Sequence, residues 1–161
     1  MAVTLRPSAP SDLAYVTALE RHPENRGQIG QWSDEEHLAA IRREGGREHW
    51  IIEREGAPAG YLIAYDNRAA GTGVYVKRIL VDAKERGTGS AALSAFLDDA
   101  FARGTDAVWL IVRNGNHRAQ AVYSRLGFAP FEPGVEEAAL YDRVNEAPPD
   151  KCFRMRVTRA R

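Results

Sequence analysis

The stretch Val74–Ala91, VYVKRILVDAKERGTGSA, decides the fold of this chain. Its apolar run ends at Val81, a short polar turn follows, and Arg86–Ala91 (RGTGSA) leads into apolar residues at helical spacing. The first N–H groups of a helix have no intrahelical partner and carry partial positive charge, so this end of a helix binds phosphate oxygens. The stretch therefore predicts a strand, a turn and a helix N-terminus that together can hold a diphosphate.

The turn RGTGSA supplies the groups that a diphosphate needs. Gly87 and Gly89 lack Cβ, so the backbone can approach an anion closely and adopt unusual φ values. Thr88 and Ser90 offer hydroxyl donors, and Arg86 brings a permanent positive charge. The spacing fits neither G-x-x-x-x-G-K-S/T nor G-x-G-x-x-G, which disfavours the nucleotide-hydrolase and dinucleotide motifs. Taken alone, the same glycines also suit a plain strand-to-helix turn.

A second strand-and-helix pair follows in the sequence. The apolar run Ala107–Val112 (AVWLIV) precedes Asn116–Phe128, NHRAQAVYSRLGF. Asn116 is a good N-cap and Gly127 a good helix stop. Because Asn116 and Tyr123 are seven residues apart, which is about two helical turns, both are expected on nearly one face of the helix.

Together the two segments resemble the GNAT superfamily of acetyl-CoA-dependent N-acetyltransferases. RGTGSA fits the cofactor signature of that family, Q/R-x-x-G-x-G/A. The family's later helix reads N-x-x-A-x-x-x-Y-x-x-x-G-F, and five residues match it position by position: Asn116, Ala119, Tyr123, Gly127 and Phe128. The resemblance covers roughly residues 3 to 131.

The resemblance implies an α/β fold of the GNAT type, a mixed sheet of about seven strands with about four helices. In that fold the fourth and fifth strands splay apart, and the pantetheine arm of CoA lies between them. The length of 161 residues fits a single domain over residues 1–161. Locally, Ser33–Glu36 reads as a capping box that opens a helix.

The resemblance also implies roles for single residues. The end of the fourth strand would pair with the pantetheine amides through its backbone, and the turn after it would hold the pyrophosphate. The implied cofactor-binding residues are Ile79, Leu80, Val81, Arg86, Gly87, Thr88, Gly89, Ser90 and Asn116. Tyr123 is the implied catalytic residue, since its hydroxyl would face the thioester sulfur and protonate the leaving thiolate. An ordinary half-buried core aromatic is the structural alternative for Tyr123.

The fourth strand lacks the acidic residue that serves as general base in many members of the family. Many members of the family carry a Glu on the fourth strand, whereas Val74–Val81 holds Tyr75, Lys77 and Arg78 and no acid. The acceptor must be neutral to attack, yet an ammonium with a pKa near 10 is deprotonated in only about one part in a thousand at pH 7. A water-mediated base, or one from another strand or loop, is then required. Its candidates stay unranked and each also reads as an ordinary surface residue: Glu20, Glu24, Asp66 and His22.

The amino-acid composition limits the classes of partner and the cellular location that are expected for this chain. The chain has 22 basic and 22 acidic residues, so no excess charge points to nucleic acid. Cys152 is the only cysteine, which excludes an internal disulfide and favours a reducing, cytoplasmic location. No signal peptide or membrane span is predicted. The four histidines have no metal-ligand spacing with each other or with Cys152, so no metal is expected.

The acceptor side is less defined. Residues 131–150, FEPGVEEAALYDRVNEAPPD, carry six acids and one base, a local net charge of −5. The segment is read either as a solvated loop or as a wall that attracts a cationic amine. Trp32 and Tyr141 are expected in loops that flank the acceptor entrance, where each either lines the pocket or packs in the ordinary way.

The sequence thus predicts an N-acetyltransferase that moves an acetyl group from acetyl-CoA to a primary amine of a small molecule or peptide. Transfer is expected to be direct, within a ternary complex, because Cys152 lies outside both motifs. The alternatives are a non-catalytic acyl-CoA-binding regulatory module, an acetyltransferase for protein N-termini or lysines, and an aminoglycoside-modifying enzyme. No nucleic-acid or membrane partner is expected, and a homodimer is compatible with the resemblance.

Overall fold

The computed structural model describes residues 2–25, 31–84, 86–144, 148 and 150–159. The strands are β1 Val3–Pro7, β2 Arg47–Arg54, β3 Ala57–Asn67, β4 Gly73–Val81, β5 Ala107–Arg113, β6 Ala129–Pro130 and β7 Cys152–Thr158. The α-helices are α1 Leu13–Arg21, α2 Asp34–Ile41, α3 Thr88–Ala102, α4 His117–Arg125 and α5 Val135–Val144. Short 3-10 helices occupy Pro10–Asp12, Glu44–Gly46 and Arg68–Ala70.

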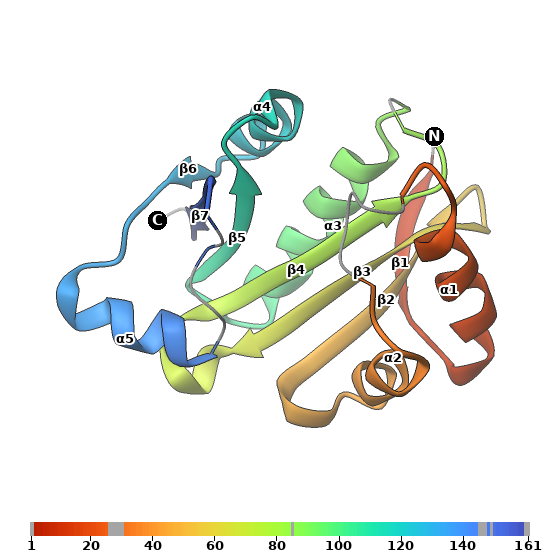
Figure 1. The fold of residues 1–161 in the computed structure, drawn as a ribbon, viewed down its shortest axis with the longest axis horizontal. Helices are drawn as coiled ribbons and strands as arrows, with labels where there is room; N and C mark the ends of the chain where they lie inside the picture. The colour runs from red at the N-terminus through yellow and green to blue at the C-terminus, as the bar shows by residue number, and fades with distance from the viewer. Residues whose placement is uncertain (1, 26–30, 85, 145–147, 149, 160–161) are drawn as a thin grey trace. The chain divides into compact units, whose positions relative to one another are not determined.

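The strands form a seven-stranded mixed sheet in the order β1-β2-β3-β4-β5-β7-β6 (Figure 1). The pairs β1–β2, β2–β3, β5–β7 and β6–β7 are antiparallel. The parallel pairing of β4 with β5 joins only Val74 to Val108 and Tyr75 to Trp109, whereas β5 pairs with β7 along its whole length. The α/β mixed-sheet prediction is confirmed. The short ladder between β4 and β5 agrees with the expectation that the fourth and fifth strands splay apart.

Backbone contacts divide the chain into two compact units, and each is described by itself. The first unit comprises Met1–Tyr65 and Arg78–Ala95, and the second comprises Asp66–Lys77 and Phe96–Arg161. The strand β4 and the helix α3 contribute residues to both units. The single-domain organisation stays a prediction.

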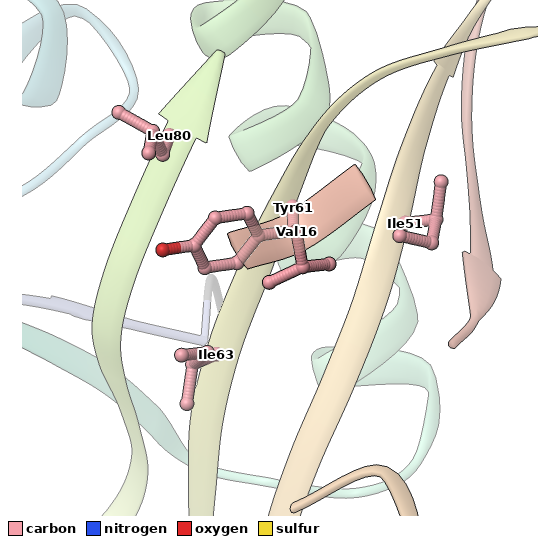
Figure 2. Packing of buried hydrophobic residues seen from close by; sticks show 5 residues of the cluster. All are labelled: Val16, Ile51, Tyr61, Ile63 and Leu80. Atoms are coloured by element: carbon pink, nitrogen blue, oxygen red, sulfur yellow. The ribbon is translucent and has the colours of Figure 1, made fainter. Parts of the chain in front are cut away.

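The core of the first unit gathers on one face of its strands. Val16 from α1 packs with Ile51 of β2, Tyr61 and Ile63 of β3 and Leu80 of β4, all less than 5% exposed (Figure 2). Ile51 lies directly opposite Tyr61 in the β2–β3 ladder, so period-two alternation places these side chains on the same face. Figure 2 shows the part of α3 that belongs to this unit behind the strands, on the face away from Val16. Each such buried aliphatic side chain stabilises the fold by roughly 2 kcal/mol.

The second unit is built around stacked aromatic rings. Tyr75 stacks on Trp109 with centroids 4.3 Å apart, and Trp109 meets Tyr141 edge-on at 5.0 Å. The Arg154 guanidinium lies over both the Trp109 and the Tyr141 rings. Tyr141 is only 3% exposed and belongs to α5. The prediction that Tyr141 lies in a loop at the acceptor entrance was therefore wrong, since its ring is part of a packed core.

The helix α5 is one more helix than the sequence led us to expect. It lies within the acidic segment, where Glu136 and Glu137 are exposed and Tyr141 is buried. Exposed acids in the first turn suit the positive end of a helix, so the charge that suggested a solvated loop is compatible with a helix. Residues 145–147 and 149 of the acidic segment lie outside the described residues.

The predicted helix ends are confirmed where capping residues were recognised. The Ser33 hydroxyl accepts from the Glu36 N–H at 3.2 Å, and the Glu36 carboxylate accepts from the Ser33 N–H at 3.1 Å. The Asn116 side chain accepts from the Ala119 N–H at 3.1 Å at the start of α4. Gly127 ends that helix region with a φ of 98°, a conformation that a side chain would strain.

Candidate functional site

The turn between β4 and α3 presents an open backbone. Gly87 has a φ of 77°, and a Cβ placed on it would meet no heavy atom of the described residues within 4 Å. A Cβ on Gly89 would meet only the Val81 side chain, at 3.9 Å. Arg86 and Gly87 are exposed. Among the described residues this backbone has little side-chain cover, and its place at the N-terminus of a helix of fifteen residues suits phosphate oxygens.

Both ends of this turn are fastened by Arg54 from β2. Its guanidinium donates to both carboxylate oxygens of Asp82, at 3.0 and 3.2 Å, and to the Thr88 hydroxyl at 3.2 Å. The Asp82 N–H donates to the Ala59 carbonyl at 2.8 Å. Thr88 is only 1% exposed. Its hydroxyl therefore lies inside the protein, which leaves Arg86, Ser90 and backbone N–H groups as the more accessible donors of the turn.

The end of β4 lies unusually close to β3. A Cβ on Gly60 would lie 2.2 Å from the Leu80 carbonyl oxygen and 2.9 Å from the Val81 Cα. Real Cβ atoms are not found at such distances from backbone atoms, so only glycine fits at residue 60. Gly60 thus sets the backbone path of Ile79–Val81, the segment expected to bind pantetheine.

In the second unit, Asn116 and Tyr123 belong to the start and the body of α4. Asn116 is exposed and its side-chain oxygen caps the helix. Tyr123 is partly buried, with its ring 5.8 Å from the Phe128 ring. Burial raises the pKa of the Tyr123 hydroxyl above its usual value, so the hydroxyl keeps its proton at neutral pH and can act as a donor.

A buried polar cluster, which we call the Glu20 cluster, occupies the first unit. Glu20 is 1% exposed, and both of its carboxylate oxygens accept hydrogen bonds. The donors are the Trp32 N–H at 2.8 Å, His37 Nε2 at 3.0 Å, the Tyr61 hydroxyl at 2.5 Å and Arg78 Nη1 at 2.9 Å. Burial raises the pKa of Glu20, but hydrogen bonds from His37, Tyr61 and Trp32 outweigh burial and lower that pKa to about 2. Glu20 is therefore a fully ionised carboxylate.

Two histidines extend the Glu20 cluster toward β1. His37 Nδ1 lies 3.1 Å from His49 Nε2, and His49 Nδ1 lies 2.7 Å from the Ser8 hydroxyl. His37 and His49 are 0% and 2% exposed. Burial and the neighbouring His37 lower the pKa of His49 to about 3, so His49 is neutral near pH 7. Because Glu20 only accepts, His37 donates its Nε2–H to the carboxylate.

The free energy of unfolding is expected to fall as the pH decreases from about 6.5 to 3. The unfolded chain protonates His49 below its ordinary pKa of 6.5, whereas the folded chain does so only near 3. The unfolded state therefore binds more protons in this window, and stability falls by up to about 1.4 kcal/mol per pH unit from this residue. Urea unfolding at pH 7, 6, 5 and 4 measures the slope.

The matched control is His22→Gln, because His22 is exposed. It should keep the wild-type slope, while His49→Gln should flatten the slope between pH 6.5 and 4.5. Below pH 4.5 the low pKa of Glu20 adds a further loss of stability, because the unfolded carboxyl protonates first. Equal stability at pH 7 and pH 5 in the wild type would contradict the assignment.

The four base candidates differ in their surroundings. Glu20 accepts four hydrogen bonds, three of them on Oε2 and one on Oε1, and these bonds favour its ionised form, so it is an anchor rather than a free base. Asp66 pairs with Arg68 at 2.7 Å, and Arg68 lowers the pKa of that carboxyl. Glu24 and His22 are exposed, and the Glu24 N–H donates to the His22 ring at 3.2 Å.

The Glu20 cluster was missed from the sequence, although a signal for it exists. Leu13, Val16 and Glu20 have the spacing of one inward face of a helix, so an acid stands where an apolar residue is expected. His49 alternates with Ile51 on a strand in the same way. A polar residue in a buried pattern indicates a partner that is also buried.

The described part of the chain holds no group of three or more His, Cys, Asp or Glu suited to a metal ion. Among the helices that the structure describes, none is long and apolar enough to cross a membrane.

Comparisons with known proteins place these features in context. The model of the acetyltransferase (GNAT) family matches residues 13–128. No curated protein sequence matches the chain. One similar solved structure is the aminoglycoside acetyltransferase AAC(6')-Ib with paromomycin and acetyl-CoA, with a TM-score of 0.75, 19% identity, and coverage of 99% of this chain and 94% of that chain.

Two further structures are similar over nearly the whole chain. A ribosomal-protein-alanine N-acetyltransferase from Escherichia coli has a TM-score of 0.70, 20% identity, and coverage of 98% of this chain and 94% of that chain. A mutant of the spermidine N-acetyltransferase SpeG from Vibrio cholerae has a TM-score of 0.72, 19% identity, and coverage of 97% and 93%. At these identities the likeness shows the fold.

Proposed function

The chain belongs to the GNAT acetyltransferase family, whose members take the acetyl group from acetyl-CoA, and we propose that it acetylates a primary amine of a small molecule or peptide. The observation that carries this proposal is the open turn at Arg86–Ser90, where, among the described residues, a Cβ on Gly87 would meet no atom within 4 Å and one on Gly89 only the Val81 side chain at 3.9 Å. Similar structures contain acetyl-CoA or CoA, and the turn offers the helix N-terminus and cation that a pyrophosphate needs.

The proposed roles follow the chemistry of acyl transfer. The backbone of Ile79–Val81 pairs with the pantetheine amides, and one of its N–H groups can stabilise the charge that develops on the carbonyl oxygen. Asn116 contacts the cofactor near the start of α4. Tyr123 gives its proton to the leaving thiolate, and its raised pKa keeps that proton available. Transfer is direct, because the single cysteine, Cys152, lies outside both motifs.

The test of the proposed function has two parts. Calorimetry should detect CoA binding, and a thiol-release assay with acetyl-CoA should then detect transfer to members of an acceptor panel of amino acids, polyamines, aminoglycosides and peptides. No heat signal at millimolar CoA would exclude the cofactor assignment. Tight CoA binding without transfer to any acceptor would instead favour the acyl-CoA-binding regulatory module.

Tyr123→Phe is expected to lower kcat by about tenfold to a hundredfold while changing the KM for acetyl-CoA little. The substitution removes only the hydroxyl, so packing against Phe128 is kept and only a proton donor to the leaving group is lost. Steady-state kinetics with an acceptor from the panel measures both constants. A kcat equal to that of the wild type would leave Tyr123 as a packing residue only.

A further inference from the structure

Arg78 carries a buried charge directly beside the proposed pantetheine segment. It immediately precedes Ile79–Val81 on β4, and its side chain is 8% exposed. Its Nη1 lies 2.9 Å from the Glu20 carboxylate, and its guanidinium carbon lies 5.7 Å from the centroid of the Trp32 ring. Trp32 is also held to Glu20 through its backbone N–H. The Arg78 guanidinium is thus fixed against Trp32, one of the two residues that the sequence suggested for the acceptor entrance.

The Glu20 cluster makes this cation rigid. Glu20 is ionised and itself held by His37, Tyr61 and the Trp32 backbone, so the carboxylate cannot turn away from Arg78. A guanidinium that is already oriented loses little freedom when it binds a ligand. Such an arrangement is more than a surface ion pair, because both charged side chains are at least nine-tenths buried.

The guanidinium has donors to spare. Arginine carries five N–H groups. Among the residues that the structure describes, Arg78 interacts with the Glu20 carboxylate, the Tyr61 hydroxyl and the Trp32 ring. The remaining N–H groups form part of a planar fork that matches a carboxylate. Arg78 can therefore bind an anionic group of a ligand, by donating hydrogen bonds to it, and still keep its ion pair with Glu20.

Charge balance decides which ligand suits this place. The Glu20–Arg78 pair is neutral as a whole, so a ligand that adds net charge beside it would bring an uncompensated charge near buried groups. A polyamine would place ammonium groups beside Arg78, which is repulsive. An acceptor with an amine and a carboxylate a few bonds apart adds no net charge. Its carboxylate can accept hydrogen bonds from the Arg78 guanidinium.

We propose that the acceptor of this enzyme is a free amino acid or a similar zwitterionic amine, with its carboxylate bound by Arg78 and its amine directed to the acetyl group. The inference rests on the proposed acetyltransferase function and names its substrate class. Arg78 is then the residue that determines acceptor specificity, and Glu20 is the positioning residue that holds it. The acidic wall proposed for residues 131–150 would favour the opposite class, a cationic amine.

The experiment compares acceptors that differ only in the carboxylate. The standard amino acids, their carboxamides, phenethylamine and spermidine are each titrated calorimetrically into the CoA-saturated protein and assayed for acetyl transfer. At least one amino acid should bind and react at least about tenfold better than its carboxamide. Equal or better binding of the carboxamides or of spermidine would overturn the proposal, while acetylation of spermidine would leave the acetyltransferase function intact.

Variants of Arg78 identify the residue responsible. Arg78→Gln should abolish the preference for the amino acid over its carboxamide, whereas Arg78→Lys, which keeps the buried charge but loses the planar fork, should retain part of it. Lys77→Gln is the matched control, because Lys77 is exposed and adjacent residues of a strand point to opposite faces. CoA affinity, measured for each variant, reports correct folding. An unchanged preference in an Arg78→Gln protein that still binds CoA would refute the assignment.

Discussion

Gly60→Ala is expected to lower the free energy of unfolding by about 3 kcal/mol and to weaken CoA binding at least about tenfold. The added Cβ would lie 2.2 Å from the Leu80 carbonyl oxygen and 2.9 Å from the Val81 Cα. Both atoms belong to backbone, so neither can give way as a flexible side chain would. The strand end must shift, and with it the backbone groups of Ile79–Val81 that are proposed to pair with pantetheine.

Gly134→Ala provides the control for this prediction, because a Cβ there would meet no heavy atom of the described residues within 4 Å and its φ is ordinary. Urea unfolding and CoA calorimetry on both variants separate the two effects. If Gly60→Ala kept wild-type stability and CoA affinity, the close approach of β3 and β4 would have no consequence for the site.

Gly89→Val is expected to have the complementary effect, a loss of CoA binding of at least about a hundredfold with stability nearly unchanged. Among the described residues, the atom nearest to a Cβ at residue 89 is the Val81 side chain at 3.9 Å, which is an ordinary van der Waals contact. The space that the new side chain fills is the one proposed for the pyrophosphate, where close backbone approach is required.

Calorimetry with CoA and a thermal unfolding curve are the two measurements, with Gly134→Val as the control for adding the same side chain outside the turn. Wild-type CoA affinity in Gly89→Val would show that the turn only connects β4 to α3. Loss of both stability and binding would also contradict a steric block by the new side chain, because such a block leaves the protein folded.

Features that depend on neighbouring residues could be predicted from the sequence. The capping box at Ser33, the cap at Asn116 and the helix stop at Gly127 are all present in the structure, because a cap is decided within a few residues. The strand–turn–helix at Val74–Ala91 is likewise present as β4, an open turn and α3. The mixed sheet follows from the alternation of such elements along the chain.

Features that join distant residues could not be predicted. Glu20 meets Tyr61 and Arg78, which are 41 and 58 residues away. These contacts depend on the register of the strands, such as His49 opposite Ile63, and register is not visible in a local pattern. The helix α5 was not predicted for another reason. Its many charged residues favoured a loop, and the buried face around Tyr141 was not recognised in the sequence.

The convergence of four donors on one carboxylate limits how acceptor preference can be engineered. Replacing Arg78 alone leaves the Glu20 charge without its cation, and replacing Glu20 alone leaves a buried guanidinium unpaired, so either single change is expected to be more disruptive than the double replacement. A library that varies residues 20 and 78 together therefore reaches folded variants that stepwise mutagenesis would discard. Variants of this protein that acetylate other acceptors are therefore expected from paired substitutions at residues 20 and 78.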